Sequence, residues 1–229
     1  DLRLSRGLGD VYKRQADLNL NGTVYTTGGA TTYASAGTDL GGSSPTFTTS
    51  ADTITFGTGN VTIADGTLTV NSVGGLIDFE GSILGTSDEV LVLNANAGSN
   101  NASTNEKVIT AVIGSGDQIH SVSITGRDGI TLEGNITTSN KASNNATFTG
   151  PVSINAATVA IDTDTATNDG TITFSSTIDS ASGTSRNLDI VSATGNVTVT
   201  GAIGATTALA TLDINQGGGD GDITLTSNI

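Results

Sequence analysis

Apolar and polar residues alternate in a nine-residue pattern that recurs five times along the chain. An aliphatic residue stands at its third position, Phe, Leu or Val at its fifth, and Ile at its ninth. The copies begin at Gly75, Asp128, Gly170, Gly195 and Gly221, so successive starts lie 53, 42, 25 and 26 residues apart. Alternation with a period of two predicts short strands. A fixed repeat of about 25 residues is typical of a solenoid or another tandem array.

A second pattern, aliphatic-x-aliphatic-Asn, occurs at 68–71, 91–94, 152–155 and 212–215. In the copies that begin at Gly170 and Gly195, the second pattern begins 18 and 17 residues later, at Leu188 and Leu212; the copy at Leu188 lacks the final Asn. Each period therefore holds at least two strands. From residue 16 onward, about 25 residues per coil predict roughly eight coils of an all-β solenoid.

If each period is one coil, like residues stack on like residues at the strand spacing of about 4.8 Å. The third, fifth and ninth positions then predict three interior columns: Ile77, Ile130, Ile172, Val197 and Ile223; Phe79, Leu132, Phe174, Val199 and Leu225; and Ile83, Ile136, Ile178, Ile203 and Ile229. The Asn residues that end the second pattern are expected to stack as an amide ladder at a corner. The intervening threonines are expected to face outward, because their β-branch favours extended backbone.

The chain divides into three parts. Residues 1–15 share neither the composition nor the period of the rest; they resemble translated adapter read-through at the ends of metagenomic reading frames, and we treat them as non-native or disordered. Residues 16–58 form an irregular β-rich opening region, and residues 59–229 form the solenoid repeats. Because Ile229 is the ninth position of the last copy, we expect a solenoid truncated at its C-terminus.

Composition supports the all-β prediction and removes several classes of partner. The 229 residues include 31 Gly and no Cys, Met or Trp, and aromatic residues make up 3%. Eight basic and 22 acidic residues give a net charge of −14, which repels nucleic acid and anionic membranes. Without cysteine, neither disulfides nor a thiol nucleophile is available. We therefore predict no nucleic-acid binding and no membrane insertion.

Groups suited to catalysis are few, and we predict no enzyme and no catalytic, cofactor-binding or metal residues. His120 is the only histidine, and a strand or turn role is expected for it. The nearest approach to a catalytic group is Arg127-Asp128 together with Asp162 and Asp164. Calcium stays an alternative: residues 217–225 resemble the Gly-Gly-x-Gly-x-Asp repeat of calcium β-rolls, except that Asp220 replaces a glycine. Residues 162–169 form a second oxygen-rich loop.

Residues 195–215 resemble the stalk repeats of large bacterial surface proteins, namely filamentous-haemagglutinin-like exoproteins and autotransporter passenger domains. The resemblance covers roughly residues 50–229 and implies a right-handed parallel β-helix. It also implies an extracellular or cell-surface location in bacteria, and an adhesive or structural role. Partners would then be glycans or proteins of host or neighbouring cells, together with adjoining repeats of the same chain. Residues 94–105 and 138–145 are predicted loops, where solenoids place binding. Two alternatives stay open: a polysaccharide lyase or hydrolase on a β-helix, and a calcium-dependent surface-layer protein.

Overall fold

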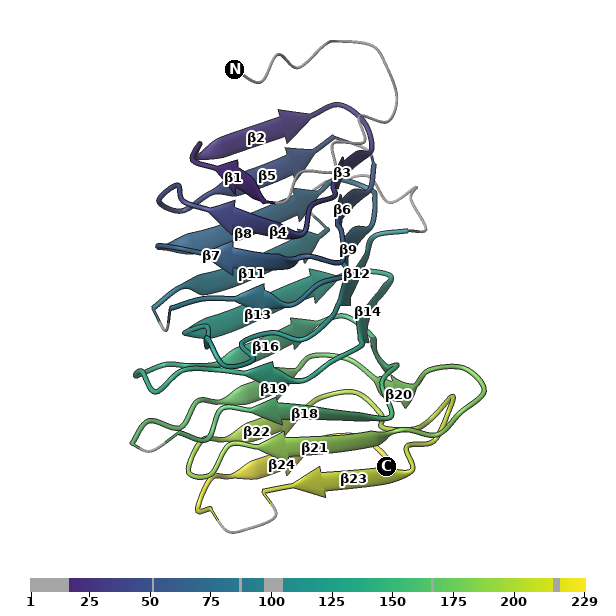
Figure 1. Ribbon diagram of the computed structural model, residues 1–229. Coiled ribbons are helices and arrows are strands. Elements are labelled where there is room, and N and C mark those ends of the chain that lie inside the picture. Colours follow the sequence, from purple (N-terminus) through teal and green to yellow (C-terminus); the bar gives the residue numbers. More distant parts are fainter. Residues whose placement is uncertain (1–16, 51, 87, 97–104, 166, 216–218) are drawn as a thin grey trace.

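The chain folds as a parallel β-solenoid, which confirms the all-β prediction. The computed structural model describes residues 17–50, 52–86, 88–96, 105–165, 167–215 and 219–229, and the only regular elements among them are strands. Residues 1–15, which sequence analysis set aside, lie outside these ranges. The coils stack along one axis in Figure 1, from the purple N-terminal coils to the yellow C-terminal ones.

The strands form three faces of the solenoid. Face 1 holds β1 (Leu18–Leu20), β4 (Gly37–Leu40), β7 (Asn60–Ile63), β10 (Ile83–Leu84), β15 (Ile136–Thr137), β18 (Thr158–Asp162), β21 (Asn187–Val191) and β23 (Thr211–Ile214). Face 2 holds β2 (Val24–Thr27), β5 (Thr46–Thr49), β8 (Thr67–Ser72), β11 (Val90–Ala95), β13 (Ser121–Gly126), β16 (Ala146–Thr149), β19 (Ile172–Phe174), β22 (Val197–Val199) and β24 (Ile223–Leu225). Face 3 holds β3 (Thr31–Tyr33), β6 (Ile54–Phe56), β9 (Ile77–Phe79), β12 (Lys107–Thr110), β14 (Gly129–Leu132), β17 (Val152–Ile154) and β20 (Ile178–Ser180).

Each coil visits face 1, face 2 and face 3 in that order, and strands on each face pair in parallel with those of neighbouring coils. The strands β10 and β20 are continued by isolated parallel bridges, to Ile113 and Ile203. On face 1, parallel bridges from Ile113 to Ile83 and Ile136 join the two four-stranded segments. Partners on face 2 lie 22 residues apart at Val24 and Thr46 and 31 apart at Val90 and Ser121. The average is roughly 24 over about 8 turns, close to the predicted period. The right-handed winding is the rule for parallel crossovers.

The core lies inside the coils and follows the predicted alternation. In β8, β11 and β13 the burial alternates strictly, with every second side chain buried. The few aromatic rings stack on one another between coils: the ring centroids of Phe56 and Phe79 are 4.4 Å apart, and those of Phe148 and Phe174 are 4.7 Å apart. Stacks of this kind add about 0.5–1.5 kcal/mol beyond the burial of their area.

The predicted interior columns are right in part. Ile172, Val197 and Ile223 do stack on face 2. Ile77 and Ile130, however, belong to face 3, where Val108 separates them. The first two copies of the nine-residue pattern turn the corner from face 3 to face 1, whereas the last three begin on face 2. The pattern encodes a strand, a corner and a strand, and any corner can accept that unit.

The corrected columns join different positions of the pattern. On face 3, the third positions Ile77 and Ile130 share a column with the ninth positions Ile178 and Ile203, through Val108 and Val152. The fifth positions divide in the same way. Phe174, Val199 and Leu225 stack on face 2, whereas Phe79 and Leu132 lie on face 3.

The expected asparagine ladder is confined to one pair. Asn71 and Asn94 are partners on face 2, and the next coil places Thr125 there. Asn155 and Asn215 lie on other faces and make different contacts: Asn155 Nδ2 donates to Glu133 Oε1 at 2.8 Å, and Asn215 Oδ1 accepts from the Ser192 amide at 2.7 Å. These side-chain amides therefore make separate contacts between neighbouring coils rather than a continuous ladder.

The region expected to be irregular, 16–58, provides the first coils of the same solenoid. Its strands β1, β2 and β3 pair with β4, β5 and β6, which in turn pair with β7, β8 and β9. Close packing continues at the corners. At Gly150, where φ is +128°, a Cβ would lie 1.9 Å from the Gly126 carbonyl oxygen. This corner therefore requires glycine on geometric grounds.

Candidate functional site

The corner that joins face 1 to face 2 carries many hydrogen-bonded polar side chains. We call it the polar corner and define it as residues 85–86, 88–89, 114–120, 138–145, 163–165, 167–171 and 192–196. Its centre is Asn144, which is fully buried. The Asn144 Nδ2 group donates to Thr138 Oγ1 at 3.2 Å and to the Thr163 carbonyl at 3.1 Å. Asn144 thereby fixes one corner to the next along the solenoid axis.

Exposed side chains continue this network outward. Asn140 Oδ1 accepts hydrogen bonds from Thr165 Oγ1 and Thr167 Oγ1, at 3.1 and 3.0 Å. Asp169 Oδ2 accepts from the backbone amide and hydroxyl of Thr194. These bonds favour the ionised carboxylate and hold the pKa of Asp169 below its ordinary value. Each of these contacts joins one coil to the next, so the side chains of the polar corner are held in fixed positions along the solenoid axis.

The predicted loop 138–145 lies in the polar corner, and only its tip is exposed to solvent. Thr138, Ser139 and Asn144 are buried, whereas residues 140–143 are exposed. His120 lies beneath the loop, and its Nε2 is 2.9 Å from the Ala142 carbonyl oxygen. This contact agrees with the structural role expected for His120. Most of the other predicted loop, 94–105, lies outside the described residues.

Glu89 is a buried carboxylate of the polar corner that the sequence analysis missed. Its side chain accepts hydrogen bonds from the amide and hydroxyl of Thr86 and from the amide of Asp88. Although burial opposes ionisation, these bonds prevail and hold the pKa of Glu89 below its ordinary value. The Thr86-x-x-Glu89 spacing is that of a capping box and could have identified the contact. These hydrogen bonds hold the turn between Thr86 and Glu89 in one conformation.

The pair Arg127-Asp128 lies at a different corner, between face 2 and face 3. Arg127 Nε is 2.8 Å from Glu106 Oε2, a contact that is an ion pair rather than an aligned hydrogen bond. The Glu106 amide donates to Asp128 Oδ2 at 2.9 Å. This bond and the neighbouring Arg127 hold the pKa of Asp128 below its ordinary value. Both carboxylates are thus engaged in cross-coil contacts.

The other half of the suggested catalytic group is Asp162, the last residue of β18, and Asp164, which lies in the polar corner. Asp162 Oδ1 accepts from the Asp164 amide at 2.9 Å, which closes a turn. Burial, with a contribution from Asp164, raises the pKa of Asp162. The six-residue strand β13 separates the two corners on face 2, a span of roughly 15–20 Å. Arg127-Asp128 and Asp162 therefore do not form one reaction centre.

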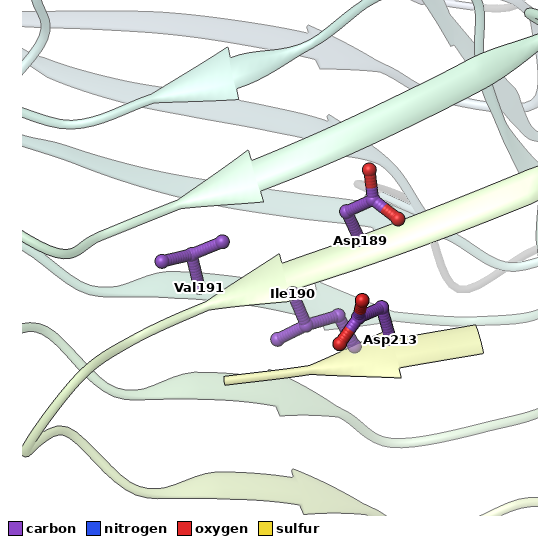
Figure 2. Close-up of a pocket in the computed structure, with 4 residues that line it drawn as sticks. All are labelled: Asp189, Ile190, Val191 and Asp213. Carbon is purple, nitrogen blue, oxygen red and sulfur yellow. The ribbon is translucent and has the colours of Figure 1, made fainter. Parts of the chain in front are cut away.

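Two further groups of acidic side chains lie on the outer surface. Burial and the nearby Glu80 and Glu133 raise the pKa of Asp78 on face 3. On face 1, Asp189 and Asp213 are partners on β21 and β23. Figure 2 shows their carboxylates beside a depression also lined by Ile190 and Val191. Its volume of about 140 Å³ is below the roughly 300 Å³ of ordinary ligand pockets.

The described part of the chain holds few side chains that are positioned to act as metal ligands. Within those ranges, no three acidic or histidine side chains lie close enough together to hold one. The β-roll-like stretch 217–225 is described only from Gly219 onward, and residue 166 of the 162–169 loop is likewise outside the described ranges. Calcium binding stays a prediction at both places.

Comparisons with protein-family models, curated proteins and solved structures found no match to this chain. Among the residues described, no helix is long and apolar enough to span a bilayer.

Proposed function

We propose that this chain is a rigid, non-catalytic stalk segment of a secreted or cell-surface bacterial protein, and that exposed loops on its corners mediate adhesion. The observation that carries the proposal is the uninterrupted parallel pairing of face 2, in which nine strands stack from β2 to β24. Such a stack gives a rod on the order of 40 Å long. Its length grows with each added coil, which is the property a spacer requires.

The polar corner supports the adhesive part of this proposal. Asn144 and Thr138 fix the base of loop 138–145, while residues 140–143 remain exposed at its tip. A loop held in this way loses little conformational entropy when it binds a partner. Glycans or proteins on host or neighbouring cells are the partners that we propose. We expect the location to be extracellular or at the bacterial surface.

The experiment is a cell-adhesion assay with the purified chain displayed on beads. Replacing residues 140–143 with a Gly-Ser sequence should reduce adhesion, because the binding tip is lost while its buried base remains. A matched control replaces the exposed turn 182–185 on the corner between face 3 and face 1. Equal adhesion by all three proteins, or no adhesion above that of bare beads, would contradict the adhesive role.

A second assay addresses catalysis. The chain is incubated with polyuronates and with neutral polysaccharides, and the release of unsaturated or reducing ends is measured. The stalk proposal expects no release above that of buffer. Release that disappears in a variant carrying Asp189→Asn and Asp213→Asn would instead favour a polysaccharide enzyme with its centre on face 1.

A further inference from the structure

Face 2 presents a regular array of hydroxyl groups to solvent. Two outward positions per strand stack in register in the five C-terminal coils. Their ten residues, which we call the hydroxyl array, are all threonine or serine: Ser123, Thr125, Thr147, Thr149, Thr173, Ser175, Thr198, Thr200, Thr224 and Thr226. The inward residues between them are apolar and hold the strands in place, as Phe148 and Phe174 do.

The hydroxyl array is uncharged although the protein is strongly acidic. The chain has 22 acidic residues, yet none of the nine strands of face 2 contains a charged residue. The strands of faces 1 and 3, by contrast, carry outward carboxylates such as Asp189, Asp213 and Asp78. A face that excludes charge in this way is suited to an uncharged partner.

The hydroxyls of the array are also available for binding, except that of Thr226, which donates to the Thr200 carbonyl oxygen at 2.8 Å. Within the described part of the chain, no hydrogen bond uses the side-chain oxygen of Thr147, Thr173 or Thr198, although all three are half-buried. Their backbone groups are occupied by the parallel ladder. Threonine has few rotamers, so neighbouring hydroxyls and methyls share one orientation at little entropic cost.

Along the solenoid axis, the spacing of the array is close to a spacing between water molecules in ice. Strands repeat at about 4.8 Å along the solenoid, and outward residues repeat at about 6.7 Å along a strand. Tetrahedrally bonded water with oxygens about 2.75 Å apart places its second neighbours about 4.5 Å apart. The mismatch of about 0.3 Å per coil is small enough for hydroxyl rotation to absorb over a few coils. The array can therefore hold water molecules near the positions of an ice lattice.

Other partners fit this surface less well. The array has no aromatic ring on which a sugar could stack, no cation for an anionic polymer and no carboxylate for a metal ion. A second copy packed face to face would have to bring its hydroxyls within hydrogen-bond distance of those of the first copy, and each hydroxyl left unpaired in that interface would cost about 1–3 kcal/mol. Ice offers a hydrogen-bonding site at every position.

We propose that the hydroxyl array of face 2 binds ice, with the hydroxyls anchoring lattice water and the methyls filling the spaces between anchored molecules. Weak contacts at many points on one rigid surface act together, so adsorption is stronger than any single contact allows. This activity is separate from the stalk and adhesion roles, because it uses face 2 rather than the loop tip at 140–143.

The test is ice-affinity partitioning of the 229-residue chain. Ice is grown slowly on a cold surface, and the protein in the ice is compared with that left in the liquid. The chain should be enriched in ice, whereas an unrelated folded protein is excluded. A variant with Thr147→Lys and Thr173→Lys should lose enrichment by about tenfold or more, equivalent to about 1.4 kcal/mol or more of binding.

Two controls make the outcome decisive. Thr131→Lys changes an outward threonine in the centre of a face 3 strand and should leave enrichment unchanged. Thr147→Val with Thr173→Val preserves the β-branched shape and removes only the hydroxyls; it should bind more weakly while retaining the circular dichroism of the parent chain. Exclusion of the parent chain from ice, equal losses in the face 2 and face 3 variants, or dimerisation through face 2 at the assay concentration would each overturn the proposal.

Discussion

Two ion pairs of nearly equal length should differ severalfold in their contribution to stability. Arg127 Nε lies 2.8 Å from Glu106 Oε2, and Lys141 Nζ lies 2.7 Å from Asp88 Oδ1. The Glu106 side chain is 1% exposed and its partner 26%, whereas the Lys141 and Asp88 side chains are 46% and 73% exposed. The perturbation is Arg127→Met, with Lys141→Met as the matched control.

The expected losses follow from burial. Removing one partner of a buried pair leaves an uncompensated charge and costs about 3–5 kcal/mol; we expect about 3 kcal/mol for Arg127→Met, because Arg127 is partly solvated. Removing a partner of an exposed pair costs less than about 1 kcal/mol. Changing Glu106 to Leu together with Arg127→Met should recover part of the loss, because neither charge is then buried.

The assay is urea unfolding followed by circular dichroism, with the free energy of unfolding taken from the midpoint and slope. A double-mutant cycle over Glu106 and Arg127 isolates the coupling between them. If Arg127→Met destabilises the chain no more than Lys141→Met, the reasoning is refuted, since the buried carboxylate would then not depend on its partner.

Three other perturbations test the core, a corner and the polar corner. Phe79→Ala removes a fully buried ring stacked on Phe56 and should cost about 3–5 kcal/mol in urea unfolding; a loss below about 1 kcal/mol would contradict the stack. Gly150→Ala meets the Gly126 carbonyl, whereas Gly116→Ala meets open space at a φ of +82°, so the first should lower the melting temperature more; equal shifts would argue against the close packing. Because the folded pKa of Glu89 lies below 4.5, the carboxylate stabilises the fold fully above that pH and progressively less as pH falls through the folded value. Glu89→Gln should therefore destabilise the chain at pH 7 and much less at about pH 3, and a gap in urea midpoint that does not narrow in acid would exclude this role.

The candidate site was only partly predictable from sequence. The loop at 138–145 and the structural role of His120 were anticipated from composition and from neighbouring residues. The buried carboxylates Glu89 and Glu106 were not: the Thr86-x-x-Glu89 spacing could have indicated the local contact of Glu89, but nothing local marks Glu106 as buried. Their partners come partly from other coils, as Arg127 does for Glu106, so the pairing depends on how coils stack.

The sequence by itself determined the period, the strands of the repeated patterns and which of their side chains point inward. These properties follow from alternation along a single strand, which is a local property of the backbone. Residues such as Ile172, Val197 and Ile223 could be aligned correctly because their copies are one period apart.

Only the tertiary structure decided which face each strand joins. Ile77 and Ile130 carry the same local pattern as Ile172, yet they stack on face 3, because the number of residues between copies sets how many corners the chain turns. The hydroxyl array likewise exists only after coiling, since Thr147, Thr173 and Thr198 come together through pairing across coils. The register between coils depends on residues that are far apart in the sequence. It determines which side chains meet in the polar corner and on face 2.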